Sequence, residues 1–429
     1  MNKLVICLIL SIFINIISGC FTIGSENNSK SSSNNNKNEK LNCTILKDGD
    51  TLSGTQKKSI CIEAHAVINL TGRILFTPNT TFKINKGAIL KGDIHSETYV
   101  VIDRGAKIDA QGTIDAPIVF TSSNPVGLRS QQDWGGLIIN GYASINGGGV
   151  EALGESGTYF GGTNDKDNSG IMKYVRIEFA GKLIAAGLEL PGLSLQGIGS
   201  NTIIEYVQTH KASDDGIDIF GGTVNLKYIV STNNWDDQLD VTFGWRGKLQ
   251  FAALASIDGD EGIEFDNNYD NFNASPQAHA IVSNITTLLG INSIGIGMTI
   301  QRGMKADFYN TYMFNGDVLV NDSPTSLTVN SFNVENGNIN PHTDGTIIGT
   351  IEFSEPDSGN YYLKGANNGL ATAKDLAALG ASAFEPTNTY ITGQKPPSDP
   401  FFDQSADYIG AVKSANENWM AGWTDFPKN

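Results

Sequence analysis

The stretch YVQTHKASDDGIDIF, Tyr206 to Phe220, recurs twice in altered form along the chain. Residues of the same kind return after 22 to 24 positions, in three series: Tyr206, Tyr228 and Phe251; Asp214, Asp236 and Asp260; Asp215, Asp237 and Glu261. A period of this length fits one coil of a parallel β-helix with three short strands, whereas a propeller blade needs about 40 residues. The spacing therefore predicts a β-helix in which residues one period apart stack directly above one another, about 4.8 Å apart.

Short β-prone runs bounded by glycine and asparagine fill the chain from about residue 41, as in MKYVRIEFAG, LKYIVSTNN and AIVSNITTLL. Inside the repeat, the strands GIDIF, QLDVTF and GIEFDN alternate apolar and acidic residues. Alternate residues of a strand face opposite sides. We therefore expect Ile217, Leu239 and Ile263 to face into the coil and Asp218, Asp240 and Glu264 to face out. The paired acids before each strand are expected on the preceding turn.

The N-terminal region has the composition of an export signal followed by a linker. Residues 1–19 contain a charged start and an apolar run too short to span a membrane, which predicts a signal peptide. Ile17-Ser18-Gly19-Cys20 resembles the lipobox of bacterial lipoproteins, and this resemblance implies a lipid, palmitate included, on Cys20. Residues 20–40 are rich in Ser and Asn and predict a flexible tether. Together they predict a lipoprotein anchored in the bacterial outer membrane, exposed at the cell surface or facing the periplasm.

The remaining cysteines and the net charge narrow the possible partners. Cys7 lies in the signal and Cys20 in the lipobox, so Cys43 and Cys61 are left to form one disulfide in an oxidising compartment. The five scattered histidines lack the pairwise spacing of a zinc site. A formal net charge of −16 and a sequence pI of about 4.7 disfavour nucleic acid, because phosphate binding needs Lys and Arg.

Four longer segments carry a resemblance to a known group of proteins: IDRGAKIDAQGTIDAPIVFTSS (102–123), DWGGLIINGYASIN (133–146), YFGGTNDKDNSGIMKYVRIEFAG (159–181) and YIGAVKSANENWMAGWTDF (408–426). They resemble exported bacterial right-handed parallel β-helix proteins with a pectate-lyase-like solenoid, many of them lipoproteins. The similarity covers roughly residues 51–426. It implies an all-β solenoid and implies little about activity, because most members have none assigned.

The ends of the solenoid must be covered, since an open coil leaves unpaired strand edges. We expect the β-helix over residues 41–333, with the Cys43–Cys61 region covering its first coil. Residues 334–429 are expected to form a C-terminal capping region packed on the last coils. Within it, NGLATAKDLAALGASAFEP (368–386) has Ala and Leu at helical spacing and predicts a helix.

The rows of acidic residues allow three interpretations, because stacked like charges must be relieved by solvent, by raised pKa values or by a bound cation. The first is a solvated acidic face whose side chains satisfy turn backbone groups. The second is a Ca²⁺ site, since that ion prefers clustered carboxylate and carbonyl oxygens. The candidate calcium ligands are Asp214, Asp215, Asp236, Asp237, Asp260 and Glu261, with Asp266 in reserve.

The third interpretation is catalytic. SDDGIDI resembles the aspartate motifs of polygalacturonase-type hydrolases, which implies Asp214 or Asp215 as the acid and Asp236 or Asp237 as the residue that activates water. The family's Gly-His-Gly motif is missing, because GIGMTI (295–300) has no histidine there. A lyase would need a base, for which Arg246 and Lys248 have a weak claim. His210 could act as a base but is expected to be a surface residue.

Two functional hypotheses follow. The first is a lipid-anchored surface protein that acts as a non-enzymatic binding or adhesion module for host matrix or plasma proteins, or for glycans. The alternative is a calcium-dependent polysaccharide lyase or an inverting glycoside hydrolase that uses the acidic residues. P-loop, nucleophile-elbow and zinc-protease motifs are not found in the sequence.

Overall fold

The computed structural model describes residues 41–147, 152–153, 157–184, 189–290, 295–354, 362–364 and 380–429. Residues Asn42–Asn429 belong to one compact unit, distinct from Met1–Leu41. The signal, Cys20 and the tether lie outside the described residues. Among those that are described, no helix is long and apolar enough to cross a membrane.

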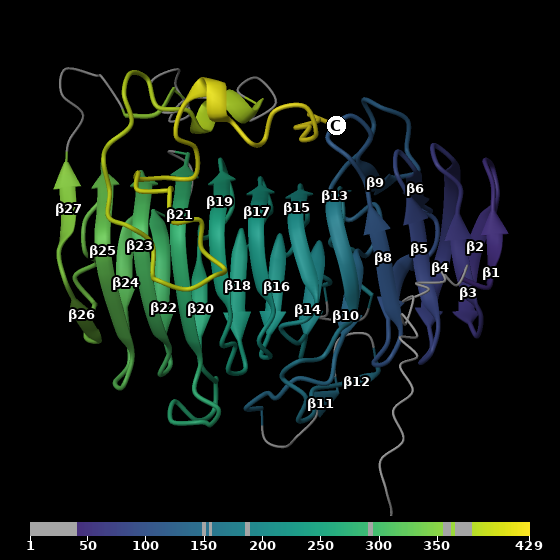
Figure 1. The fold of residues 1–429 in the computed structure, drawn as a ribbon, viewed down its shortest axis with the longest axis horizontal. Helices are drawn as coiled ribbons and strands as arrows, with labels where there is room; N and C mark the ends of the chain where they lie inside the picture. The colour runs from purple at the N-terminus through teal and green to yellow at the C-terminus, as the bar shows by residue number, and fades with distance from the viewer. Residues whose placement is uncertain are drawn as a thin grey trace, which may run out of the picture. The chain divides into compact units, whose positions relative to one another are not determined.

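Parallel strands stack coil upon coil and form a right-handed β-helix, which confirms the predicted fold class (Figure 1). One face of the coils, called here the first sheet, consists of β7 (Tyr99–Ile102), β10 (Leu137–Asn140), β14 (Leu193–Gln196), β16 (Ile217–Phe220), β18 (Leu239–Thr242), β20 (Glu264–Asp266), β22 (Ile296–Gln301) and β24 (Asp317–Val320). The other two faces share longer strands that bend in the middle: β13 (Gly170–Glu178), β15 (Ile203–His210), β17 (Asn225–Thr232), β19 (Lys248–Ser256), β21 (His279–Leu289), β23 (Lys305–Phe314) and β25 (Ser326–Glu335).

The remaining elements belong to the two ends and to one side ribbon. The first coils contain β1 (Cys43–Leu46), β2 (Thr51–Gln56), β3 (Ser59–Ile62), β4 (Val67–Phe76), β5 (Thr81–Asn85), β6 (Ile89–Gly92), β8 (Lys107–Gln111) and β9 (Ile118–Ser122). The last coil contains β26 (Thr346–Ile348) and β27 (Ile351–Ser354), which pair with β25. An antiparallel ribbon joins β11 (Ala152–Leu153) to β12 (Tyr159–Phe160). Two short 3₁₀ helices are η2 (Gly380–Phe384) and η3 (Ala415–Glu417).

The aromatic repeat marks the bend of the long strands. Tyr206 separates two halves of β15 that pair with β17 on two different faces, and its φ is 56°. Tyr228 and Phe251 take the same position with φ of 61° and 63°. This backbone region costs a bulky residue roughly 1–2 kcal/mol. Stacking offsets that cost, since the Tyr206–Tyr228 and Tyr228–Phe251 ring centroids are 4.3 and 4.9 Å apart. The predicted 22- to 24-residue stacking is therefore confirmed.

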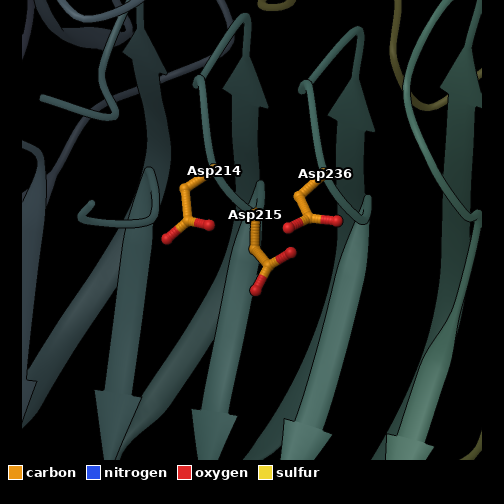
Figure 2. A group of neighbouring side chains, drawn as sticks. All are labelled: Asp214, Asp215 and Asp236. Carbon is orange, nitrogen blue, oxygen red and sulfur yellow. The ribbon is translucent and has the colours of Figure 1, made fainter. Parts of the chain in front are cut away.

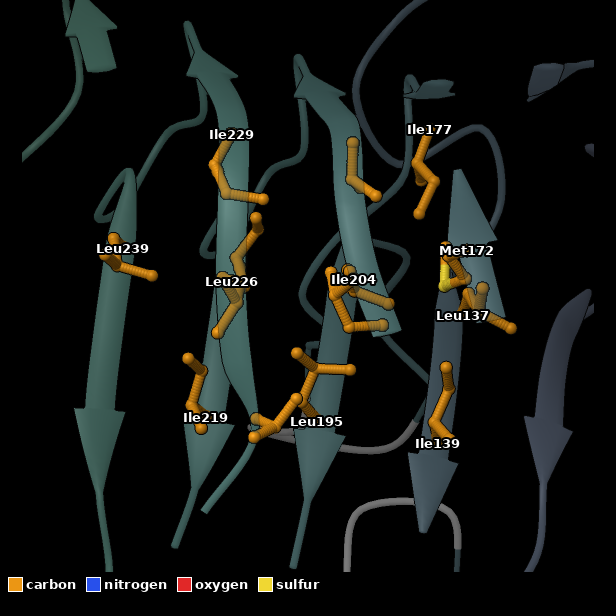
Figure 3. Packing of buried hydrophobic residues seen from close by; sticks show 14 of the residues in the cluster. Leu137, Ile139, Met172, Ile177, Leu195, Ile204, Ile219, Leu226, Ile229 and Leu239 are labelled. Atoms are coloured by element: carbon orange, nitrogen blue, oxygen red, sulfur yellow. The ribbon is translucent and has the colours of Figure 1, made fainter. Parts of the chain in front are cut away.

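The interior is a continuous apolar core, as the alternation predicted. Ile217 and Ile219 of β16 are fully buried, and Leu239 of β18 pairs with Ile217 in the strand register. Ile219 and Leu239 point into the coil (Figure 3). Residues from the other two faces, such as Leu226 and Ile229, meet them inside the coil. Because the core fills the coil, polar residues of the first sheet must lie on its outer side.

The C-terminal region differs from the expected end cap. The coils continue past residue 333, because β26 and β27 add strands up to Ser354. Residues 380–429 then run back along the side of the solenoid toward β13 (Figure 1). Asn284 and Asn310, at the bend position of later coils, bind the main-chain oxygens of Tyr408 and Gln394, both at 2.7 Å. Most of the helix expected over residues 368–386 lies outside the described residues.

The expected disulfide joins Cys43 of β1 to Cys61 of β3. These strands pair in parallel, so the bond ties the first coil to the second. In the register Cys43 lies opposite Ser59, two residues before Cys61, and the Cα atoms of the two cysteines are 5.8 Å apart.

Candidate cation-binding site

The paired acids of the repeat form a hydrogen-bonded column on the turn before the first sheet. The Oδ1 atom of Asp215 accepts a hydrogen bond of 2.9 Å from the backbone N–H of Asp237. In the next coil, Oδ1 of Asp237 accepts one of 3.0 Å from the N–H of Glu261. Each carboxylate thus binds the backbone of the residue stacked on it. The column follows from the period, because Asp215, Asp237 and Glu261 occupy one position of successive coils.

A second row lies on the outer side of the first sheet. Asp218 of β16 pairs in register with Asp240 of β18, which pairs with Glu264 of β20. Oxygen atoms of three overlapping trios lie within 4.8 Å of one another: Asp214, Asp215 and Asp236 (Figure 2); Asp215, Asp218 and Asp240; and Asp237, Asp240 and Glu264. These seven residues are called the acidic cluster below. Shared members make it continuous across three coils.

Burial of the cluster contradicts the solvated acidic face. Asp215, Asp218, Asp237 and Asp240 point outward as expected, yet they are only 3 to 9% exposed. Strand spacing of about 4.8 Å leaves no room for water between carboxylates of successive coils. Asp236 is exposed and Asp214 half-buried, so the cluster meets solvent at its turn side. The repulsion between these carboxylates must therefore be relieved by raised pKa values or by a bound cation.

The pKa values of five members of the cluster are raised: Asp214, Asp215, Asp236, Asp237 and Asp240. Burial, followed by the charges of Asp240 and Asp237, raises the pKa of Asp215 well above its usual value. Burial and neighbouring carboxylates do the same to Asp237 and Asp240. At the rim, burial and the charges of Asp236 and Glu189 raise the pKa of Asp214 to about 6. Protons therefore stay on some of these groups near neutral pH unless a cation replaces them.

Glu261 and Asp266 adjoin the cluster and share its electrostatics. Burial raises the pKa of Glu261 to about 8. Burial and the charge of Glu264 raise the pKa of Asp266 to about 7, although Arg302 opposes the shift. Arg302 contacts Asp266 and lies 3.8 Å from Glu264. No other Lys or Arg among the described residues pairs with these carboxylates, so positive charge is scarce here.

An aromatic residue flanks the cluster at the far end of the strands. Tyr269 stacks beneath the Arg302 guanidinium, 5.0 Å from the ring centroid, and meets the Phe243 ring edge-on at 5.7 Å. Although 47% of Tyr269 is exposed, burial of its hydroxyl and the charges of Asp240 and Asp218 raise its pKa. Tyr269 and Arg302 were not among the site residues predicted from the sequence. They lie in turns whose position beside the cluster has no periodic signal.

The donor set suits a hard divalent cation. The cluster offers carboxylate oxygens alone, the ligand type that Ca²⁺ prefers. One oxygen of Asp266 and one of Asp260 are buried without a hydrogen-bond partner among the described residues, which is costly unless a proton or cation satisfies them. Of the predicted ligands, Asp214, Asp215, Asp236 and Asp237 lie in the trios. Asp260 and Glu261 do not, whereas Asp218, Asp240 and Glu264 were missing from the predicted set.

The catalytic candidates outside the cluster have other partners. Arg246 binds Asp165 at 3.2 Å, and Lys248 binds Asp399 of the C-terminal segment. His210 was expected at the surface but is buried: its ring bonds Thr232 Oγ1 at 2.8 Å and the oxygen of Pro427 at 3.0 Å. The returning C-terminal segment covers His210, and strand position alone could not indicate that.

Stacked parallel coils with an acidic cluster on the first sheet define a right-handed β-helix with a candidate cation site. Residues 54–424 match the family described as pectate-lyase like beta helix domain, and the chain belongs to that family. No curated protein matches the sequence.

Similar solved structures include three β-helix proteins. The pectate lyase Pel9A is 14% identical, with 86% of this chain and 87% of that one covered and a TM-score of 0.40. A variant of the periplasmic alginate epimerase AlgG is 10% identical, with coverages of 72% and 76% and a TM-score of 0.31. The Dettilon tailspike protein is 11% identical, with coverages of 71% and 61% and a TM-score of 0.28.

Proposed function

We propose that this β-helix binds Ca²⁺ at the acidic cluster and, through it, an anionic glycan, without catalysing a reaction. The observation that carries the proposal is the trio packing: seven carboxylates in contact, most of them buried, with Arg302 as the paired base among the described residues. Asp215 and Asp240 would hold the ion because each belongs to two of the trios, and Asp237 would join them as the most buried member of the third. Bound Ca²⁺ supplies a positive centre that takes six to eight oxygen ligands, so a glycan carboxylate can complete its coordination.

The environment favours binding over lyase chemistry. A lyase that uses Lys or Arg as its base needs that side chain unprotonated beside the cation. Arg302 is the basic residue at this place, and although burial opposes it, contact with Asp266 raises the pKa of Arg302. It therefore stays protonated. Its role is to hold Asp266 and to stack on Tyr269, whose exposed ring gives a sugar an apolar surface.

Calorimetric titration of the folded body with Ca²⁺, followed by a polyuronate with and without Ca²⁺, tests the proposal. We expect Ca²⁺ binding in the wild type, its loss in Asp237→Asn and Asp240→Asn, and polyuronate binding that requires the ion. Glu352→Gln is the matched control, because Glu352 is an exposed carboxylate on β27. Unsaturated or reducing-end products that vanish in Asp237→Asn would instead establish an enzyme, and unchanged Ca²⁺ affinity in both aspartate variants would exclude the site.

We further propose that Cys20 carries a lipid and holds this binding face at the outer membrane. The lipobox-like Ile17-Ser18-Gly19-Cys20 and the polar residues 20–40 support it. Labelling cells with a clickable palmitate analogue tests it, with Cys20→Ser as the variant expected to lose the label. Shaving intact cells with protease separates surface from periplasmic exposure, since the surface protein alone is degraded.

A further inference from the structure

A hollow of about 300 Å³ lies on the other side of the turns that carry the acidic cluster. Its lining combines the turn residues Lys211, Asn233 and Trp235 with Arg129 and Lys428 from two distant segments. Asp258 is the acidic side chain among the described residues that line it. Three cationic side chains gather here although the chain's formal charge is −16, and one of them, Arg129, also lies 4.0 Å from the buried Glu178.

The three cationic side chains come from three different segments of the chain, and each segment is held in place by hydrogen bonds. Lys211 and Asn233 occupy the same turn position of successive coils, with φ of 58° and 55°, so the coil stack fixes both. Gln131 ties the Arg129 loop to this wall by donating to the main-chain oxygens of Ala212 and Asn233, at 2.9 and 3.2 Å. This anchoring holds the loop wall against the turn wall.

The third wall is the end of the C-terminal segment. The N–H of Gly127 donates to the main-chain oxygen of Asn429 at 3.0 Å, and Lys211 Nζ donates to that of Lys428. His210 binds the neighbouring Pro427 at 3.0 Å. The hollow is therefore built from three fixed segments and does not depend on one mobile surface chain.

Trp235 gives the hollow an exposed aromatic wall. Its side chain is 62% exposed, whereas its backbone is held on both sides, by the Ala212 oxygen at 2.9 Å and by the N–H of Asp260 at 3.2 Å. An indole on a fixed backbone loses little conformational freedom when a ring stacks on it. It also lies one residue before Asp236 of the acidic cluster.

We propose that this hollow is a binding site for one anionic sugar residue, carrying a carboxylate or sulfate group. The pyranose ring stacks on Trp235, and the anionic group pairs with Lys211, Lys428 and Arg129. The volume is at the low end of the roughly 300–1,000 Å³ range of small-molecule sites, which suits a single sugar ring. No cation is needed, so the site acts independently of Ca²⁺ at the acidic cluster.

Tryptophan fluorescence in EDTA reports on this site. Trp134, Trp245 and Trp423 are fully buried and Trp419 is half-buried outside the hollow, so the ligand protection from acrylamide quenching that is lost in Trp235→Ala arises at Trp235. We expect saturable binding of a uronate or sulfated disaccharide, and at least tenfold weaker binding of the neutral disaccharide of the same linkage and of inorganic sulfate. Calorimetry extends the test to variants. Trp235→Ala and Lys211→Asn should each weaken binding at least tenfold, and Lys211→Asn repeats the Asn233 turn residue, so the turn is kept.

Lys305→Met, an exposed lysine at the start of β23, is the control and should not change the affinity. Equal binding of the neutral disaccharide, equal binding of sulfate alone, or unchanged affinity in both Trp235→Ala and Lys211→Asn would overturn the proposal. Asp237→Asn removes the proposed Ca²⁺ ligand and should leave this binding intact, so failure of either site is seen separately.

Discussion

Raising the pH from 5 to 8 in EDTA should destabilise the folded body, and Ca²⁺ should reverse the loss. The sign follows from raised carboxyl pKa values. A buried acid that holds its proton in the folded state gives up that stability as the pH rises through its folded pKa. Asp266 is 1% exposed and has a pKa of about 7 against an ordinary value of 3.8. Its contribution is intact below pH 4 and is lost by about pH 8.

Asp266 alone sets the size of the expected loss in unfolding free energy. From pH 5 to its pKa, about two units at 1.36 kcal/mol each remove about 3 kcal/mol. The body spans Asn42–Asn429, and an unfolding entropy of about 2.1 cal/mol/K per residue gives it about 0.8 kcal/mol/K. The melting temperature should therefore fall by at least about 4 °C, with Glu261, whose pKa is about 8, adding in the same direction. Ca²⁺ at 100 times its Kd should return about 2.7 kcal/mol.

Differential scanning calorimetry at pH 5 and pH 8, with EDTA or Ca²⁺, measures this, and Asp237→Asn separates the causes. Asn keeps an oxygen for the Glu261 N–H and removes one buried charge. The variant should melt higher than wild type at pH 8 in EDTA and gain nothing from Ca²⁺. A melting temperature independent of pH in EDTA, or equal Ca²⁺ stabilisation of wild type and Asp237→Asn, would refute the reasoning.

Three further predictions concern the scaffold. Reducing the Cys43–Cys61 bond should cost about 3 kcal/mol from its 18-residue loop, seen as a lower urea midpoint that Cys61→Ser reproduces. Tyr228→Ala should cost about 2 kcal/mol, since it removes two stacked ring contacts worth about 1 kcal/mol each, while Tyr228→Phe keeps them; urea melts distinguish the two. Trp423→Ala should loosen the C-terminal segment from the Tyr206 ring and speed its cleavage in limited proteolysis without unfolding the coils.

The fold was predictable from its periodicity, because every coil places the same kind of residue at the same position. A residue at the bend must stack on its counterparts, so Tyr206, Tyr228 and Phe251 identify the register from sequence. Cys43 and Cys61 meet because their strands are neighbours, although in the register Cys43 lies opposite Ser59 and Cys61 opposite Ile45. The path of residues 380–429 was not predictable, because it depends on contacts such as Gln208 with Asp425, 217 positions apart and outside any repeat.

The same distinction explains why the outward direction of Asp218 and Asp240 was predictable and their burial was not. Strand alternation indicates that Asp218 and Asp240 point out of the coil, but it does not indicate how deeply these side chains are buried. Their burial depends on the turns beside the sheet and on residues such as Tyr269, whose positions the repeat does not specify. A row of outward carboxylates therefore has the same sequence pattern whether water reaches it or not.

The hydrogen bonds of the column do not by themselves explain its charges. Asp215 and Asp237 each accept a backbone N–H of the next coil, and an asparagine oxygen would accept it equally well. Asparagine would also avoid the repulsion and desolvation that raise the pKa of both residues. The fold alone would thus be more stable with amides at these positions. A cation site requires such negative charge despite its cost, and the Asp237→Asn variant measures that cost directly, with and without Ca²⁺.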